Sequence, residues 1–161
     1  MRRLQAVAVA AFILLIAGSA HADRRNFAFT YEPRTIPEGH AELEYYMTGL
    51  VKHDRLLNED VYVWSHQFEV EYGVFDGFDL AMYQMYSPSA WQGYKLRARY
   101  MPFARGELPI DFLLYLEFIQ LANGDVALEE RLVLGREFGN VILALDTMFE
   151  QGPLNGDIGQ K

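Results

Sequence analysis

The sequence predicts an all-β protein, an antiparallel meander of about seven or eight strands that follows an N-terminal signal helix. Three observations support this fold class. Apolar and polar residues alternate with a period of two over long stretches, and glycine-containing dipeptides typical of hairpins separate several of these stretches. Aromatic residues, which favour strands, make up 14% of the chain.

The first 22 residues have the three parts of a cleavable secretory signal peptide. Arg2-Arg3 forms a positive n-region, residues 4–17 are almost wholly apolar, and Ala20-His21-Ala22 supplies the A-x-A pattern that signal peptidase recognises. The apolar stretch is shorter than the ~20 residues that a membrane anchor needs. We therefore expect residues 1–22 to be removed and residues 23–161 to form one antiparallel β-barrel domain, or only its N-terminal part.

Seven segments of the mature chain are expected to be strands. In residues 61–75, bulky apolar and polar side chains alternate over more than ten positions. The segment Ile110–Gln120 is apolar on both faces, so its pattern alone also admits a helix, but its neighbours favour a strand. Phe27–Glu32 is a candidate eighth strand. The seven expected strands cover residues 40–48, 61–75, 78–86, 93–101, 110–120, 127–138 and 141–150.

Two dipeptides predict two-residue hairpin loops and, with them, the strand register. A two-residue loop at Gly139-Asn140 pairs Phe138 with Val141 and Leu134 with Leu145. This register places the mainly apolar faces of both strands on the same side. The same arithmetic at Asp76-Gly77 pairs Phe68 with Met85. Both loops therefore predict antiparallel neighbours with two unlike faces.

The lengths of the connections predict an outer-membrane β-barrel, in which longer external loops alternate with shorter periplasmic turns. Bacterial single-chain barrels have an even number of strands, but only seven are counted, and residues 152–161 are expected to be an exposed loop. We therefore expect a truncated open reading frame or further strands beyond residue 161. The expected external loops are residues 49–60, 87–92 and 121–126, and the periplasmic turns are residues 76–77, 102–109 and 139–140.

Charged residues of both signs alternate with the apolar positions of these strands. If the polar faces point inward, they provide either the transverse field of a selective pore or a salt-bridged plug in a narrow barrel. The candidate lumen-facing charges are Glu69, Glu71, Lys95, Arg97, Arg99, Asp111, Glu117, Glu129, Arg131, Asp146 and Glu150.

Composition and motifs argue against several classes of function. The formal charge of −8 argues against a nucleic-acid partner, and the absence of cysteine excludes disulfides. Ser65 and His66 are neighbours on a strand, so their side chains point to opposite faces and do not form a nucleophile and base. No zinc spacing, phosphate-binding glycine loop or hydrolase elbow is present. The sequence thus predicts no catalytic residue, metal or cofactor.

Two segments resemble a group of uncharacterised proteobacterial outer-membrane β-barrel proteins. Residues 35–44 (TIPEGHAELE) follow the pattern "lP-G--E-E", and residues 68–80 (FEVEYGVFDGFDL) follow "E-EYG--d-f-l". The later segments Leu116-Glu117-Phe118 and Glu129-Glu130-Arg131-Leu132 are similar in spacing. The resemblance implies an envelope barrel of unknown cargo, without catalytic residues to carry over.

The leading hypothesis is an outer-membrane β-barrel that acts as a passive pore or a structural envelope protein. Its expected partners are outer-membrane lipid and the barrel-assembly machinery. The alternative is a soluble periplasmic β-sandwich or a lipocalin-like binding protein, in which the apolar faces form a core. A lipid-modifying barrel enzyme would need a Ser/His or His/carboxylate set at the outer rim, which the sequence does not supply. The two main hypotheses differ in the direction of five side chains, Trp64, Phe68, Tyr72, Tyr94 and Phe149.

Overall fold

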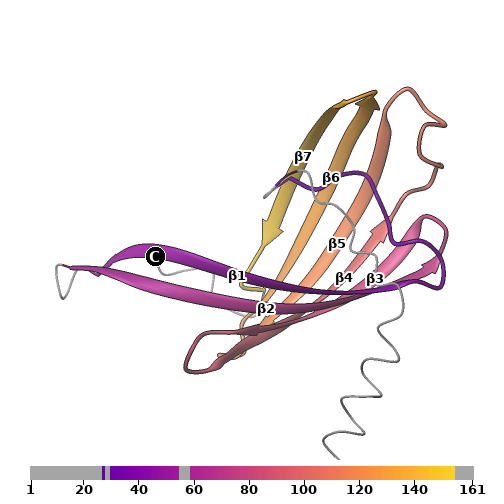
Figure 1. Cartoon of the computed structure of the whole chain (residues 1–161). Helices are drawn as coiled ribbons and strands as arrows, with labels where there is room; N and C mark the ends of the chain where they lie inside the picture. Colours follow the sequence, from indigo (N-terminus) through magenta and orange to yellow (C-terminus); the bar gives the residue numbers. More distant parts are fainter. Residues whose placement is uncertain (1–26, 28–29, 55–58, 155–161) are drawn as a thin grey trace, which may run out of the picture.

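The computed structural model describes residues 27, 30–54 and 59–154, which contain seven β-strands in a single sheet (Figure 1). The predicted signal peptide and residues 155–161 lie outside the described residues. In the part of the chain that is described, no helix is long and apolar enough to cross a membrane. The strands are β1 (Ala41–Asp54), β2 (Glu59–Phe75), β3 (Phe78–Tyr86), β4 (Trp91–Tyr100), β5 (Asp111–Leu121), β6 (Val126–Phe138) and β7 (Val141–Gln151).

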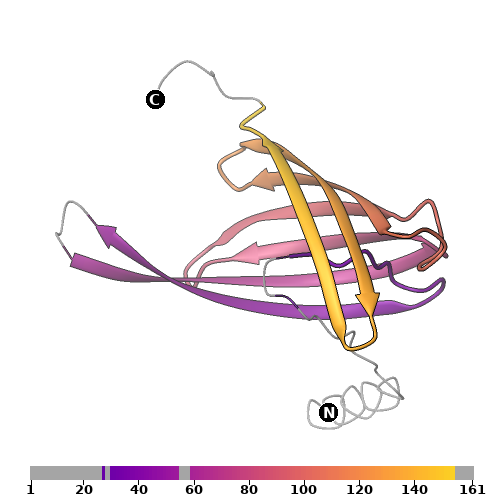
Figure 2. The same cartoon turned by 90° about the horizontal axis from the view of Figure 1, so that it is seen from above.

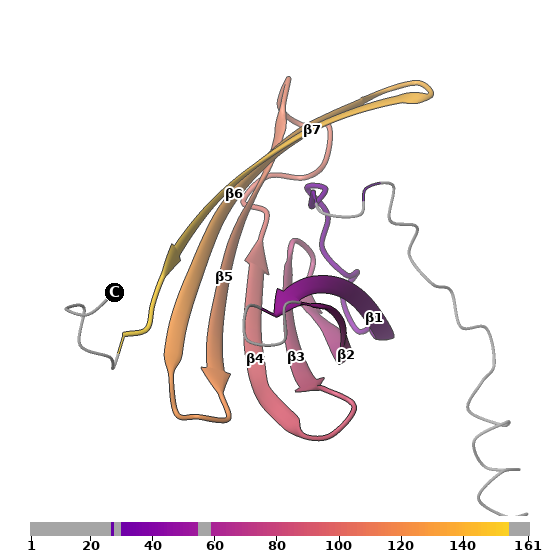
Figure 3. The ribbon, with the colours of Figure 1, turned by 90° about the vertical axis from the view of Figure 1, so that its left-hand side faces the viewer.

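The sheet is an antiparallel meander with the strand order β1-β2-β3-β4-β5-β6-β7. It curves into an open half-barrel, as Figure 3 shows. Figure 2 shows that β6 and β7, at one edge of the sheet, run at an angle to β1 and β2 at the other. Among the described residues, β1 and β7 are the edges and do not pair with each other. The predicted all-β meander is therefore confirmed, as an open sheet.

The predicted strands agree with the observed ones to within two residues, apart from the first. Strand β1 continues to Asp54 because residues 49–54 pair with residues 59–64 in a long ribbon beyond the rest of the sheet. Strand β5 excludes the helix that the pattern of Ile110–Gln120 also admits. At its described residues, 27 and 30–32, the candidate eighth strand is not a strand.

The predicted register is confirmed at one hairpin and wrong at the other. Around Gly139-Asn140 the strands pair in step from Phe138 and Val141 onward, as expected. At the other hairpin Phe68 lies opposite Gln84 instead of Met85, because a bulge between Gly73 and Phe75 adds one residue to β2. A shift of one residue moves every side chain of a strand to the other face. Consequently β3 turns its odd-numbered residues to the concave face.

The two faces of the sheet are inverted relative to a soluble protein. Ion-paired side chains such as Glu69 and Arg97, which are 0% and 1% exposed, lie on the concave face. Large apolar side chains such as Leu43 and Phe149, which are 75% and 67% exposed, lie on the convex face. Strict alternation along each strand produces this separation, since successive side chains point to opposite faces.

Residues 30–40 cross the concave face before β1 begins, and we call this segment the strap (Figures 1 and 3). The strap has no regular secondary structure apart from a turn at Glu38-Gly39. Its Ile36 is buried, and its Tyr31 packs on a small apolar cluster of the sheet that includes Leu113 and Val133. The strap thus covers part of the concave face.

Candidate functional site

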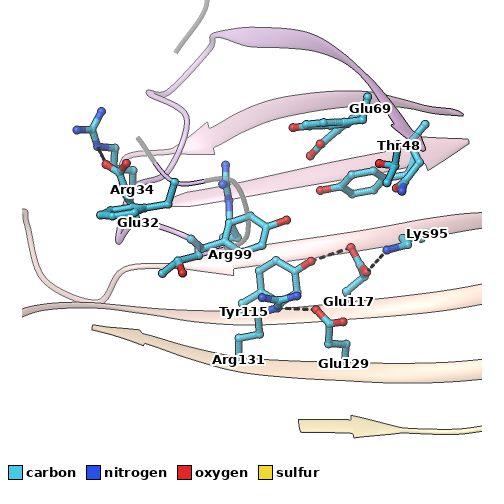
Figure 4. A pocket seen from close by; sticks show the side chains of 16 residues that line it. Glu32, Arg34, Thr48, Glu69, Lys95, Arg99, Tyr115, Glu117, Glu129 and Arg131 are labelled. Atoms are coloured by element: carbon cyan, nitrogen blue, oxygen red, sulfur yellow. Dashed lines mark hydrogen bonds and ion pairs between the residues drawn. The ribbon is translucent and has the colours of Figure 1, made fainter. Parts of the chain in front are cut away.

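A cavity of about 260 Å³ lies on the concave face between the strap and strands β1 to β6 (Figure 4). Its lining combines tyrosine hydroxyls, such as that of Tyr115, with acidic and basic side chains, such as Glu69 and Lys95. The arrangement of these charged groups decides what the concave face can do chemically.

Arg97 is the centre of the most buried group of charges. Its guanidinium lies 2.6 Å from Glu69 Oε1 and 2.9 Å from Glu71 Oε1. It also donates a hydrogen bond to the hydroxyl of Tyr83 and lies over the rings of Tyr83 and Tyr115. The planar guanidinium offers several donors in a fixed geometry, so it can hold both carboxylates at once.

The strand register explains why Arg97 reaches two strands away. Arg97 on β4 lies beside Ala81 on β3, which in turn lies beside Glu71 on β2. Because Ala81 is small, the arginine side chain extends over β3 to the carboxylates of β2. Arg99 has a direct partner instead, since Asp79 lies opposite it on β3 and accepts hydrogen bonds from it at 2.7–3.1 Å. Arg99 also lies 2.7 Å from Glu71.

A second group of charges follows on β4 to β7. Lys95 lies 2.9 Å from Glu117 Oε1, and the hydroxyl of Tyr115 donates to Glu117 Oε2 at 2.7 Å (Figure 4). Arg131 bridges Glu129, at 2.6 Å, and the next strand through its contact with Asp146 at 2.8 Å. Each ion pair therefore ties neighbouring strands or neighbouring positions on one strand.

The structure brings together ten of the eleven predicted charges on the concave side or its rim. Asp111 lies near the end of the sheet, where it accepts a hydrogen bond from the N–H of Gly106 at 2.6 Å and lies 3.5 Å from Arg136. Glu150 is the exception, because it lies opposite Glu129 near the edge of the sheet but is exposed. The four predicted basic residues, Lys95, Arg97, Arg99 and Arg131, each have a carboxylate within 2.9 Å.

Three carboxylates of this face are close enough together to be considered as a metal site. Oxygens of Glu44, Glu69 and Glu71 lie within 4.8 Å of one another. Glu69 and Glu71 already hold the guanidinium of Arg97, whose positive charge takes the place that a cation would occupy. Glu69 and Glu71 are therefore best described as part of the ion-pair network, and Glu44 accepts a hydrogen bond from the hydroxyl of Tyr46 beside them.

Several important residues were not predicted from the sequence. Asp79 was missed because the expected register puts it opposite Val74, whereas the bulge puts it opposite Gly73 and on the concave face. Tyr83 was missed for the same reason. Ile36 was missed because the strap has no periodic pattern; its N–H donates to Asp79 at 2.9 Å. No periodicity in the sequence gives the position of such a segment.

Gly73 is the position at which the strap approaches the sheet most closely. A Cβ at this position would lie 2.6 Å from the carbonyl oxygen of Ile36 and would also collide with that of Pro37. The backbone of Gly73 is moreover bound to the strap, because Gly39 N–H donates to Gly73 O at 2.9 Å. Only a residue without a side chain leaves room for the strap here.

We expect Gly73→Ala to lower the free energy of unfolding by about 1–3 kcal/mol, because the strap backbone must move to admit the methyl group. Urea unfolding followed by tryptophan fluorescence would measure the change. Gly49→Ala is the matched control, since the new Cβ would meet only the ring of Trp64, a side chain that can shift. Equal effects of both substitutions would argue against the close approach of the strap.

No protein-family model, curated protein or solved structure matches this chain. Its class is therefore defined by its geometry alone. That geometry is a seven-stranded antiparallel half-barrel with a charge-paired concave face and an apolar convex face.

Proposed function

We propose that this chain forms an outer-membrane β-barrel domain that acts as a passive pore or a structural component of the envelope. One observation carries the proposal: the sheet buries its charges and exposes its large apolar side chains. In water this arrangement is unfavourable, because exposed apolar surface costs about 25 cal/mol per Å². In a bilayer the convex face would contact lipid, and the polar concave face would line the interior, as in known barrels.

Some of the aromatic side chains support the same conclusion, because eleven of them lie in two rows on the convex side. At one end the rings of Phe75 and Phe78 are 5.0 Å apart, and at the other the rings of Tyr45 and Phe68 are 4.9 Å apart. Membrane barrels carry aromatic girdles at both interfaces. The first row consists of Phe75, Phe78, Tyr100, Phe103 and Phe112, and the second of Tyr45, Phe68, Tyr86, Trp91, Tyr94 and Phe118.

The distance between the two aromatic rows suits a bilayer. On β3 the rows are represented by Phe78 and Tyr86, which are eight residues and therefore about 26 Å apart along the strand. For the usual strand tilt of about 40° this corresponds to roughly 20 Å across the membrane, close to the apolar band of about 25 Å in known barrels. Three convex residues lie between them. Leu80 and Met82 are apolar, and Gln84 is polar and lies beside the second row.

Two charged residues, Glu130 and Arg136, occupy convex positions of the strands between residues 62 and 151. Arg136 lies two residues from the end of β6, whereas Glu130 is the fifth of its thirteen residues, opposite Leu116 of β5, and is the exception on the convex face. Arg136 turns away to donate to the carbonyl oxygen of Leu108 at 2.8 Å. A charge on the lipid face costs much less near the interface than at the midplane, so the position of Arg136 agrees with the proposal.

The directions of the five discriminating side chains favour the membrane protein over the soluble periplasmic alternative. Trp64, Phe68, Tyr72 and Phe149 are exposed on the convex side, and Tyr94 is half-buried there. A soluble sandwich or lipocalin-like protein would place these side chains in a core. The concave side instead holds ion pairs, which favour a charge-compensated interior over the transverse field of a strongly selective pore.

Fractionation of the expressed full chain tests the proposal. We expect the protein in the outer-membrane fraction, extraction only with detergent, and a heat-dependent shift in its mobility on SDS gels. These properties would follow if the edge strands β1 and β7, which do not pair with each other among the described residues, have pairing partners in the membrane, because the backbone hydrogen bonds of such a sheet resist SDS until heated. Recovery in detergent-free buffer together with the absence of a gel shift would overturn the proposal.

A further inference from the structure

We propose that the strap, residues 30–40, is a built-in plug that closes the passage along the concave face, and that its displacement opens this passage. The inference rests on the proposed membrane barrel and adds a regulatory role for a segment outside the strands. Four observations support it: the cavities on either side of the strap, its polar anchors, the glycines beneath it and its apolar seat.

The strap separates two cavities. The cavity of about 260 Å³ lies on one side of it, and a second cavity of about 580 Å³ lies on the other, toward the turn at residues 76–77. Strap residues line both cavities, and Arg34 belongs to the lining of each. Removal of the strap would therefore join the two volumes into one continuous space along the concave face.

Buried carboxylates on opposite sides of the sheet anchor the strap. Ile36 N–H donates to Asp79 on β3 at 2.9 Å, and Tyr31 N–H donates to Asp146 on β7 at 3.2 Å. Both carboxylates also hold arginines of the ion-pair network, since Asp79 binds Arg99 and Asp146 binds Arg131. The strap is thus attached at two points of its path by backbone hydrogen bonds to carboxylates, and breaking these bonds does not separate the carboxylates from their arginines.

Two glycines on the concave face make room for the strap. Besides Gly73 on β2, Gly135 on β6 has no space for a side chain, because its Cβ would lie 2.8 Å from Cδ of Pro33. Three strands lie between β2 and β6 in the sheet, so these glycines mark two separate points of the strap's path. A glycine inside a strand weakens it and is expected where another backbone approaches closely.

The apolar seat of the strap is small. The ring of Tyr31 lies 5.1 Å from that of Tyr115, beside the buried side chains of Leu113 and Val133. The guanidinium of Arg131 lies over both rings, 5.0 Å from the centre of Tyr31 and 5.3 Å from that of Tyr115. Ile36 supplies a second apolar contact and is 4% exposed. Loss of these two side chains removes most of the apolar contact of the strap while the strands remain unchanged.

The first part of the test is a release variant, Tyr31→Ala with Ile36→Ser, in the full chain. Its conductance in planar lipid bilayers is compared with that of the unchanged protein, and its heat-dependent gel shift verifies folding. We expect the ratio of open to closed states to rise at least about tenfold, which corresponds to a loss of about 1.4 kcal/mol of docking free energy. Val70→Ala, at an exposed position on the convex side of β2 outside the bulge, is the matched control and should leave the ratio unchanged.

The second part is a reversible lock, which the absence of cysteine in the chain makes simple. Pro33 Cγ lies 3.0 Å from the Cβ position of residue 135. Disulfide bond lengths place a sulfur about 3 Å from the partner Cβ, so a sulfur near the position of Pro33 Cγ would join Pro33→Cys to Gly135→Cys. The proline ring that collides with a Cβ at residue 135 is absent from this pair, and the remaining 3.0 Å contact with the carbonyl oxygen of Leu143 requires a small shift of β7. On the release background the oxidised protein should be closed and the reduced protein open, whereas either cysteine alone should not respond to reductant.

The outcomes separate the plug from the barrel on which it depends. A protein that inserts into bilayers with the same conductance in the unchanged, released and locked forms would overturn the plug and leave the barrel intact. Failure of every form to insert, with recovery in detergent-free buffer, would overturn the barrel and the plug together. If the release variant does not fold, the two cysteines are placed in the otherwise unchanged chain. Loss of its residual channel openings on oxidation would then support the plug, and openings that do not depend on the redox state would contradict it.

Discussion

Arg97→Ala is expected to lower the free energy of unfolding by about 3–5 kcal/mol, the usual cost of removing one partner from a buried ion pair. The substitution removes the guanidinium that lies 2.6 Å from Glu69 and 2.9 Å from Glu71, and of the two buried carboxylates Glu71 keeps a partner in Arg99 at 2.7 Å. Since both carboxylates are almost wholly buried, water does not replace the lost partner. Urea unfolding in detergent micelles, followed by tryptophan fluorescence, would measure the loss.

Arg105→Ala is the matched control for this experiment. Arg105 also forms an ion pair, with Glu137 at 2.5 Å, but both side chains are about 40% exposed. An exposed pair contributes only about 0–1 kcal/mol, so we expect a small effect. Adding Glu69→Gln and Glu71→Gln to the Arg97 variant should recover part of its stability, because the buried negative charges disappear. A loss below 1 kcal/mol for Arg97→Ala would contradict the burial of this network.

Met82→Arg is expected to destabilise the protein by about 2–4 kcal/mol in lipid vesicles, because the new charge would face the centre of the bilayer. Met82 lies midway between the two aromatic rows on the convex face of β3 and is 47% exposed. In a soluble protein an exposed position of this kind tolerates arginine within about 0.5 kcal/mol. The free energy of unfolding in phosphatidylcholine vesicles therefore discriminates between the two classes of protein.

Tyr86→Arg provides the control on the same strand and the same face. Tyr86 belongs to the aromatic row near the membrane interface, where an arginine costs only about 0–1 kcal/mol. The expected result is thus a dependence on depth, with a large effect at Met82 and a small one at Tyr86. Indifference to arginine at both positions would favour the soluble periplasmic alternative.

Much of the strand architecture follows from local chemistry that the sequence displays directly. Alternation from Tyr62 to Tyr72 is long enough to predict a strand, because only a pleated strand places every second side chain on one face. The Gly139-Asn140 loop fixed its hairpin register correctly, since a two-residue turn leaves one way of pairing the strands. The same alternation also places Arg97, Glu117 and Glu129 on one face.

The Asp76-Gly77 hairpin shows where local rules fail. Its bulge is stabilised by contacts outside the hairpin, because the strap binds the backbone of Gly73 and hydrogen-bonds to Asp79. A rule that considers only the loop and its two strands therefore gives a register that is wrong by one residue. That error reversed the expected faces of β3 and hid Asp79 and Tyr83 from the predicted site.

The sequence by itself determined the number of strands, the bounds of six of the seven to within two residues, their order as neighbours and, outside β3, the segregation of charge from apolar surface. These features depend on alternation and turn chemistry within a few residues. Only the tertiary structure decided which charges meet and where the strap lies. Arg97 reaches Glu71 across a third strand, and Tyr31 reaches Asp146, 115 residues away, so both contacts depend on the curvature of the whole sheet. No local pattern encodes that curvature.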